Sequence, residues 1–575
     1  MKFAGSPGRP QASNIHGPVT TGTEETVTFE GGHAYSRTAE SDLFVLAATN
    51  MVGEDTFYES AEVRDKRFVD LIHEVTRTNP AFIAGGTGVF VGPGPNVQHP
   101  RGLVDYLRRD LLMRSASVVL ACEYVKAGGP RGRLAINAAC QRPDEPAEIL
   151  GYWMTTHGRN LPMPVKRGVA DAVRRLYNER AALRYDGQSR GLRMGDVIEL
   201  VHPKPVDTRQ AALFKYLLDE RHHGDGGQRM AVLVGDHPVN LQTLCADRLL
   251  KEIPAEERRA FMRAATTSAD SRQGLTWSYA GWSWERLSGW LPGGMDAEAW
   301  SWVIPNMGVM ALVRNLRNFD QAGIPDSTVD AVIAKITDPE EVKRARLFPF
   351  HAWQAYQAAP SDNWKRALGK TLDLTTRNIP DALDGSLVVI DCSGSMQGEM
   401  SGRSKLRRWE VAAVLGASLA HGTKDSNVVI FGQQNRDVTQ PAGSSALRTV
   451  ERVAQAVARG EVGHATFGHT AVREHWRVGQ HKRVFIVTDD QMHDSVERGG
   501  GDPHSGWVRR QYGYRGMTAA DISHVPLVYT VNVGGYAPSS LESGERGRYT
   551  LAGFGDAGFT TVAAIEAGRD ARWEF

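Results

Sequence analysis

The segment that most constrains the fold is residues 386–396, Ser-Leu-Val-Val-Ile-Asp-Cys-Ser-Gly-Ser-Met. An apolar, β-branched run that stops in a loop of small polar residues is typical of a buried parallel strand in an α/β sheet. Such sheets bind ligands at that end of their strands. The sequence therefore predicts a Rossmann-like α/β domain over residues 384–575, with further strands at 427–431, 483–490 and 525–533 and a helix at 406–419.

The loop after the first strand presents oxygen atoms at alternate positions, from Asp391, Ser393 and Ser395. Hard oxygen ligands suit Mg²⁺ rather than a soft metal. A haloacid-dehalogenase-like phosphotransferase also begins with an Asp after a strand. Its chemistry needs a second carboxylate two residues further on, where this chain has Ser393.

Two later positions complete a pattern. Thr470 follows a glycine turn at 467–470, and Asp489 ends the apolar run at 483–488. Together, the five residues resemble the metal-ion-dependent adhesion site of a von Willebrand factor A domain. The resemblance implies Mg²⁺ or another divalent cation bound by Asp391, Ser393, Ser395, Thr470 and Asp489. A loop that is merely hydrogen-bonded is the alternative.

Composition limits the remaining choices. The 575 residues are too many for one core, and the formal net charge of +1 means that any polyanion-binding surface must be a local patch. Four scattered cysteines without metal spacing indicate free thiols in a reducing compartment. Residues 1–25 are rich in Gly, Pro, Ser and Thr and predict a disordered tail without a signal peptide. With no membrane-spanning apolar run, we predict a cytoplasmic protein.

The first half of the chain is predicted to be helical. Apolar residues recur at helical spacing and strand alternation is absent. So many consecutive helices favour a curved array of degenerate, HEAT-like repeats. Glycine-rich loops are expected at 85–94 and 224–227, and a linker at 371–384. The predicted helices are 42–49, 61–76, 103–127, 165–179, 210–221, 255–265, 297–319, 327–336 and 339–347.

Several motifs in this half resemble a known family. Met307-Gly308-Val309-Met310-Ala311-Leu312-Val313-Arg314-Asn315-Leu316 resembles the Met-Pro-Leu-Thr-Ala-Leu-Leu-Arg-Asn-Leu signature of the TROVE module. Pro349-Phe350-His351 is similar to the Pro-Phe-His stretch near the end of that module, and 196–205 resembles its Asp-Leu-Leu-Arg-Leu-Ser-His-x-Lys-Pro. A TROVE module (here 26–375) before an A domain is the architecture of the Ro 60 kDa autoantigen family.

The resemblance implies an RNA-binding protein rather than an enzyme. In this family a ring of helical repeats binds Y RNA, a small noncoding RNA, on its outer surface and the single-stranded ends of misfolded RNA in its basic hole. Polynucleotide phosphorylase is a bacterial partner. We therefore expect a cytoplasmic, monomeric protein of noncoding-RNA quality control. The alternative is a scaffold whose A domain captures an acidic partner through its metal.

RNA phosphates need cations, which residues 166–204 supply in number, with tyrosines as possible stacking faces. Arg184, Arg190 and His202 lie at or near basic positions of the family motifs. The chain departs from the family at 192–195 and at Glu199, which leaves the detailed Y RNA contacts open. Basic stretches at 108–114 and in an insertion at 497–515 are weaker candidates. The predicted RNA-binding residues are Lys166, Arg167, Arg174, Arg175, Arg184, Tyr185, Arg190, His202 and Lys204.

Overall fold

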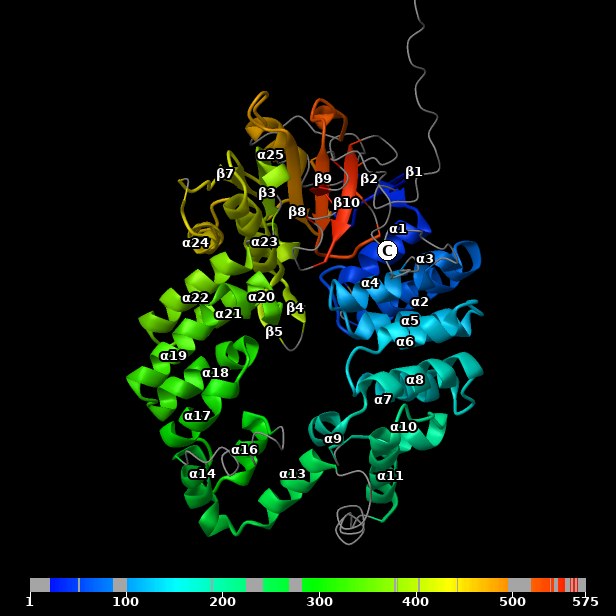
Figure 1. Cartoon of the computed structure of the whole chain (residues 1–575). Coiled ribbons are helices and arrows are strands. Elements are labelled where there is room, and N and C mark those ends of the chain that lie inside the picture. The colour runs from blue at the N-terminus through cyan, green and yellow to red at the C-terminus, as the bar shows by residue number, and fades with distance from the viewer. Residues whose placement is uncertain are drawn as a thin grey trace, which may run out of the picture. The chain divides into compact units, whose positions relative to one another are not determined.

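The computed structural model divides the chain into two compact units, one comprising Met1–Leu71 and Thr376–Phe575 and the other Ile72–Thr375. The first contains the predicted α/β domain and the second most of the predicted helical module, so the predicted fold class is confirmed (Figure 1). The residues that the structure describes are 21–49, 52–85, 101–187, 190–223, 241–267, 282–376, 379, 381–401, 404–441, 443–494, 519–537, 539–541, 547–553, 559, 562–563 and 566.

The helical unit consists of short helices that pack mainly against near neighbours in the chain, such as α5 on α6 and α21 on α22. This local packing is typical of helical-repeat arrays. No described helix has the length and hydropathy needed to cross a membrane. The helices are α2 (Ala61–Thr78, which crosses into this unit), α3 (Pro80–Ala84), α4 (Leu103–Arg109), α5 (Ser115–Lys126), α6 (Gly132–Ala139), α7 (Glu145–His157), α8 (Met163–Leu176), α9 (Glu179–Tyr185), α10 (Met194–Val201), α11 (Thr208–His223), α13 (Gln242–Glu252), α14 (Arg258–Thr267), α16 (Trp284–Trp290), α17 (Ala297–Val303), α18 (Val309–Ala322), α19 (Asp326–Ile336), α20 (Pro339–Ala345), α21 (Pro349–Ala358) and α22 (Asp362–Thr375).

Two predicted helices are broken in the structure. The expected helix 103–127 is α4 followed by α5, with Leu112 between them at a φ of 56°. The expected helix 297–319 is α17 and α18 separated by the 3₁₀ turn Ile304–Asn306, because Pro305 has no amide hydrogen for a continuous helix. The predicted loop at 224–227 and nearly all of that at 85–94 lie outside the described residues.

The α/β unit is built on a six-stranded sheet in the order β10-β9-β8-β3-β6-β7. All pairs are parallel except β6–β7, and Val388 of β3 pairs with Val428 of β6 and Phe485 of β8. The strands are β3 (Ser386–Asp391), β6 (Asn427–Phe431), β7 (Asn435–Asp437), β8 (Arg483–Thr488), β9 (Val528–Asn532) and β10 (Arg548–Ala552), with a separate hairpin β4 (Glu399–Ser401) and β5 (Ser404–Arg407).

Helices cover both faces of this sheet. Alternation along β3 sends Val389 into a core with Val472 of α25 (Gly468–His475) and Trp476, which caps that helix. Ile390 faces the opposite way onto Gly416 of α23 (Arg408–Gly422), where an added Cβ would lie 2.6 Å from its side chain. A further helix, α24 (Ala446–Ala458), packs on α23.

The N-terminal segment belongs to the α/β unit, not to the helical module as predicted. A hairpin of β1 (Thr21–Val27) and β2 (His33–Arg37) precedes the buried helix α1 (Ala39–Thr49), which packs on β10. The predicted disordered tail is therefore wrong for residues 21–25. Two backbone hydrogen bonds join Tyr35 to Ser539, and the fully buried Arg37 guanidinium lies 2.6 Å from the Asp490 carboxylate. These contacts fix the segment to the sheet.

Candidate cation site and basic surface

The five predicted metal ligands gather at the carboxyl edge of the sheet. Asp391 ends β3 and Asp489 directly follows β8, which is the neighbouring parallel strand. The order of the strands reverses at β3, because β6 lies on one side of it and β8 on the other. Open α/β sheets bind ligands at the carboxyl ends of the strands at such a switch point. The first turn of α25 adds Thr470, and the loop after β3 adds Ser393 and Ser395.

Hydrogen bonds within the site leave some oxygen atoms unused. Asp391 accepts bonds from the Ser393 amide at 2.8 Å and the Thr488 hydroxyl at 2.5 Å. By contrast, both carboxylate oxygens of Asp489 and the Thr470 hydroxyl are buried without a hydrogen-bond partner among the described residues. Buried polar groups are almost always satisfied, so unpartnered buried oxygens at this edge of the sheet fit a cation site.

The charges of the site point the same way. Burial raises the pKa of the Asp391 and Asp489 carboxyls above their usual range; the charge of Asp391 adds to the rise for Asp489, and that of Asp490 adds to the rise for Asp391. Two carboxylates and three hydroxyls form a hard oxygen set of the kind that Mg²⁺ prefers. No cluster of three or more His, Cys, Asp or Glu side chains suited to a metal occurs in the described part of the chain, and the predicted set contains only two such residues.

The basic surface lies in the helical unit, around α8 and α9. Val165, Val169 and Val173 bury one face of α8, which leaves Arg167 and Arg174 exposed, seven residues apart on one face. With Lys166, Arg184 and Lys204, these side chains form no hydrogen bond or ion pair with another described residue. We call the five residues Lys166, Arg167, Arg174, Arg184 and Lys204 the free basic surface.

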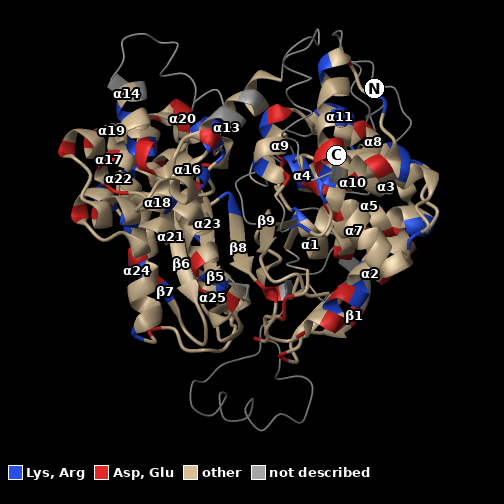
Figure 2. Ribbon diagram, turned by 90° about the horizontal axis from the view of Figure 1, so that it is seen from below, with Lys and Arg blue, Asp and Glu red and all other residues tan. Residues whose placement is uncertain are grey.

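The neighbouring carboxylates are already engaged. Asp171 binds Arg133 and Asp186 binds Arg193, each at 2.6 Å. Glu179 and Asp196 are paired in the same way with Arg209 and Arg221, each at 2.5 Å. The free basic surface is therefore not neutralised by these carboxylates, although basic and acidic residues are both scattered through the chain (Figure 2).

Two predicted RNA-binding arginines have structural partners. Arg175 donates to the carbonyl oxygens of Asn137 and Cys140, at 3.1 and 2.5 Å, and so satisfies the carboxyl end of α6. Arg190 lies 3.5 Å from Asp144. Their roles in RNA binding remain predictions that these contacts do not favour.

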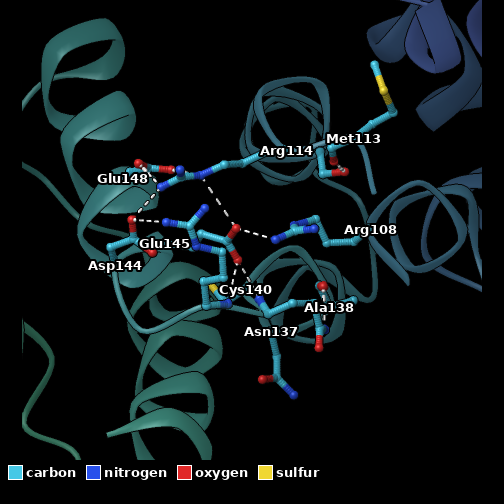
Figure 3. Close-up of polar contacts among 12 residues, drawn as sticks. Arg108, Met113, Arg114, Asn137, Ala138, Cys140, Asp144, Glu145 and Glu148 are labelled. Atoms are coloured by element: carbon cyan, nitrogen blue, oxygen red, sulfur yellow. Dashed lines mark hydrogen bonds and ion pairs between the residues drawn. The ribbon is translucent and has the colours of Figure 1, made fainter. Parts of the chain in front are cut away.

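The basic stretch at 108–114 is largely committed to an internal network. Arg108 binds Glu145, and Arg114 binds Asp144 and Glu148, so the guanidinium groups converge on the amino end of α7 (Figure 3). Arg108 is also buried. The insertion at 497–515 lies outside the described residues.

The remaining predicted residues lie near the free basic surface in sequence. His202 is the left-handed cap of α10, with a φ of 48°, and its side chain is exposed. Tyr185 is flanked by the guanidinium groups of Arg184 and Arg142, 5.6 and 5.5 Å from its ring. Arg142 was not predicted, because it is more than forty residues away in sequence.

Comparison with known proteins shows what this chain is similar to. A family model described as the TROVE domain matches residues 178–379. The chain is similar to the RNA-binding protein RO60 of Deinococcus radiodurans, with 24% identity over 453 residues, 74% of this chain and 75% of that protein. Among solved structures, the crystal structure of the Deinococcus radiodurans RO (RSR) protein is 18% identical, with a TM-score of 0.48, and the match covers 87% of this chain and 99% of that one.

Proposed function

The chain belongs to the Ro 60 kDa family, and from that premise we propose that it binds RNA through the free basic surface of its helical unit. The observation that carries the proposal is the contrast between unpaired cations and engaged carboxylates. Exposed Arg167, Arg174 and Arg184 have no acidic partner among the described residues, so phosphate oxygens can approach them without breaking an ion pair.

The flanked Tyr185 ring adds a means of contacting bases. Aromatic faces stack on unpaired bases of single-stranded RNA, and guanidinium groups beside the ring supply phosphate contacts. We propose Y-like noncoding RNA and the single-stranded ends of misfolded RNA as ligands, in noncoding-RNA quality control. A cytoplasmic monomer that acts by binding rather than catalysis, with polynucleotide phosphorylase as a partner, completes the proposal.

RNA binding can be tested with a labelled hairpin RNA that carries a single-stranded 3′ tail. We expect the triple variant Arg167→Gln, Arg174→Gln, Arg184→Gln to bind at least about tenfold more weakly in fluorescence anisotropy. The slope of log K against log salt should fall by roughly 2, because each lost phosphate contact removes about 0.7 to 0.9.

A matched control removes three exposed cations elsewhere in the same unit: Arg263→Gln, Lys335→Gln and Arg344→Gln. This variant has the same net charge as the triple variant but should retain nearly all of the affinity and salt slope. Equal losses in both variants, or no loss in either, would contradict the proposal.

A second candidate function is metal-dependent capture of an acidic partner, supported by the orphaned oxygens of Asp489 and Thr470. Asp391, Ser393, Ser395, Thr470 and Asp489 would hold the cation, which would offer a positive ligand position to a carboxylate. Capture of an acidic peptide in Mg²⁺ that is lost on chelation and in both Asp391→Ala and Thr470→Val, with RNA binding unchanged in the triple variant, would favour this function.

A further inference from the structure

The turn of the β1–β2 hairpin is built against the loop that carries Asp489. The Thr28 hydroxyl donates to the Met492 carbonyl at 3.3 Å, and the Phe29 amide donates to the Gln491 side chain at 2.8 Å. At Gly32 an added Cβ would lie 2.0 Å from the Met492 carbonyl oxygen. The turn, which carries Glu30, is thus packed tightly against residues 491–492, close in sequence to Asp489.

Tyr58 links Glu30 to the site. Its hydroxyl donates to the Glu30 carboxylate, and its ring stacks on Phe29 with centroids 5.2 Å apart and packs edge-on against Tyr536 at 5.3 Å. Burial raises the pKa of Tyr58, as do the Glu30 and Asp489 carboxylates. The Ser395 hydroxyl has the opposite effect on this pKa. Tyr58 is therefore bonded to Glu30 and lies within the electrostatic influence of Asp489, a predicted metal ligand.

The ligand set also leaves a position to fill. If each of the five side chains supplied one oxygen atom, Mg²⁺, which takes six, would keep at least one position for water or for a further acidic side chain. In a partner-binding site this last position would receive an acidic side chain from another molecule. Here an acidic side chain of the same chain is present, and the buried Arg408 next to Tyr536 offsets part of the negative charge.

We propose that Glu30 is an internal ligand of the cation site: its carboxylate, carried by the hairpin turn and steadied by Tyr58, takes the position that a partner's acidic side chain would otherwise fill. The inference rests on the cation site proposed above and is independent of RNA binding. It makes the site closed in the free protein, and partner carboxylates gain access only when the turn moves away.

The test uses the full chain, stripped of metal with a chelator and titrated with Mn²⁺. Water-proton relaxation counts the exchangeable waters on bound Mn²⁺. We expect Glu30→Gln to gain about one such water relative to the unsubstituted protein and to bind Mn²⁺ at least about tenfold more weakly. Acetate should displace that additional water in the variant and have little effect on the unsubstituted protein.

Two further variants distinguish the effects of side-chain length and charge at position 30 from a general loss of structure. Glu30→Asp keeps the charge but shortens the side chain and should resemble Glu30→Gln. Glu25→Gln, on the same hairpin and 3.6 Å from His33, should behave as the unsubstituted protein. Thermal unfolding without metal checks that each variant is folded. Mn²⁺ bound equally well and with the same number of waters in all variants overturns the inference alone. No Mn²⁺ binding to the unsubstituted protein overturns the cation site as well.

Discussion

At the residue scale, the ion pair between Arg37 and Asp490 connects the N-terminal hairpin to the sheet of the α/β unit. Both side chains are completely buried, and Asp490 also accepts a bond from the Ser540 amide at 2.9 Å. A pair of this kind adds little net stability over apolar side chains, but the loss of one partner leaves an uncompensated buried charge.

We therefore expect Arg37→Ala to lower the free energy of unfolding by about 3–5 kcal/mol in urea titrations followed by circular dichroism. The matched control is Lys66→Ala, which breaks the exposed pair with Asp70 and should change stability by no more than about 0.5 kcal/mol. Similar small effects of both substitutions would show that Asp490 is not held as described.

His351 predicts how stability depends on pH in the helical unit. Burial, and then the positive charge of Arg314, lower its pKa to about 4, and its Nδ1 has no hydrogen-bond partner among the described residues. The unfolded chain binds a proton near pH 6.5 whereas the folded chain does not. Stability should therefore be unaffected above that pH and fall between about 6.5 and 4, by on the order of 2 kcal/mol after allowance for partial exposure.

Because many carboxylates also titrate in acid, the measurement is a difference. Melting curves of the unsubstituted protein and of His351→Gln at pH 7 and pH 5 should show a smaller loss in the variant. An equal loss of stability in both proteins would show that His351 does not contribute to the pH dependence.

At the scale of elements, α8 depends on a close approach to α6. A Cβ added at Gly168 would lie 2.7 Å from the Arg133 carbonyl oxygen and 2.6 Å from the Ile136 Cβ atom, and neither is the flexible end of a side chain. The helix that carries Arg167 and Arg174 can therefore pack this closely on α6 only because residue 168 has no side chain.

Gly168→Ala should accordingly destabilise the helical unit by about 1–3 kcal/mol through overpacking, despite the better helix propensity of Ala. Gly151→Ala in α7 is the matched control. An added Cβ there comes no nearer than 4.0 Å to another group, so this substitution should be neutral or stabilise by up to about 1 kcal/mol. A melting temperature that falls in Gly168→Ala but not in Gly151→Ala would support the packing. Equal shifts in the two variants would contradict it.

The elements also show what sequence can predict. Strand β6 has the predicted bounds because its apolar run is contiguous and buried. The hairpin β1–β2 was missed because its strands are largely polar, and Tyr35 of β2 bonds to Ser539, some five hundred residues away; the one local signal was the Gly31-Gly32 turn. The structural role of Arg175 could not be predicted from the sequence either. Its position on α8 is that of an exposed residue, and only the tertiary fold brings the end of α6 next to it.

At the scale of the whole molecule, the α/β unit is assembled from both ends of the chain. Helix α1 is buried over most of its length, and Leu43 and Leu46 are fully inaccessible. A fragment of residues 376–575 alone would expose the apolar surface that this helix covers and would leave Asp490 buried without Arg37.

We expect residues 376–575 alone to be insoluble or to melt well below the unit formed when residues 1–71 are co-expressed as a separate chain. Co-purification through a tag on either fragment, followed by a thermal melt, measures this. A lone fragment as stable as the complex would show that the N-terminal segment contributes little.

This assembly from both ends has a consequence for synthesis on the ribosome. At about 5–20 residues per second, translation from residue 71 to residue 376 takes roughly 15–60 s. Throughout that interval the hairpin with Glu30 and the apolar helix α1 have emerged without the sheet on which they pack. The helical unit can fold in the meantime, whereas the nascent N-terminus must stay unaggregated until the last strand, β10, is released. A ribosome that stalls before that strand leaves a product with an exposed apolar helix at its beginning, a feature that chaperones and proteases can recognise.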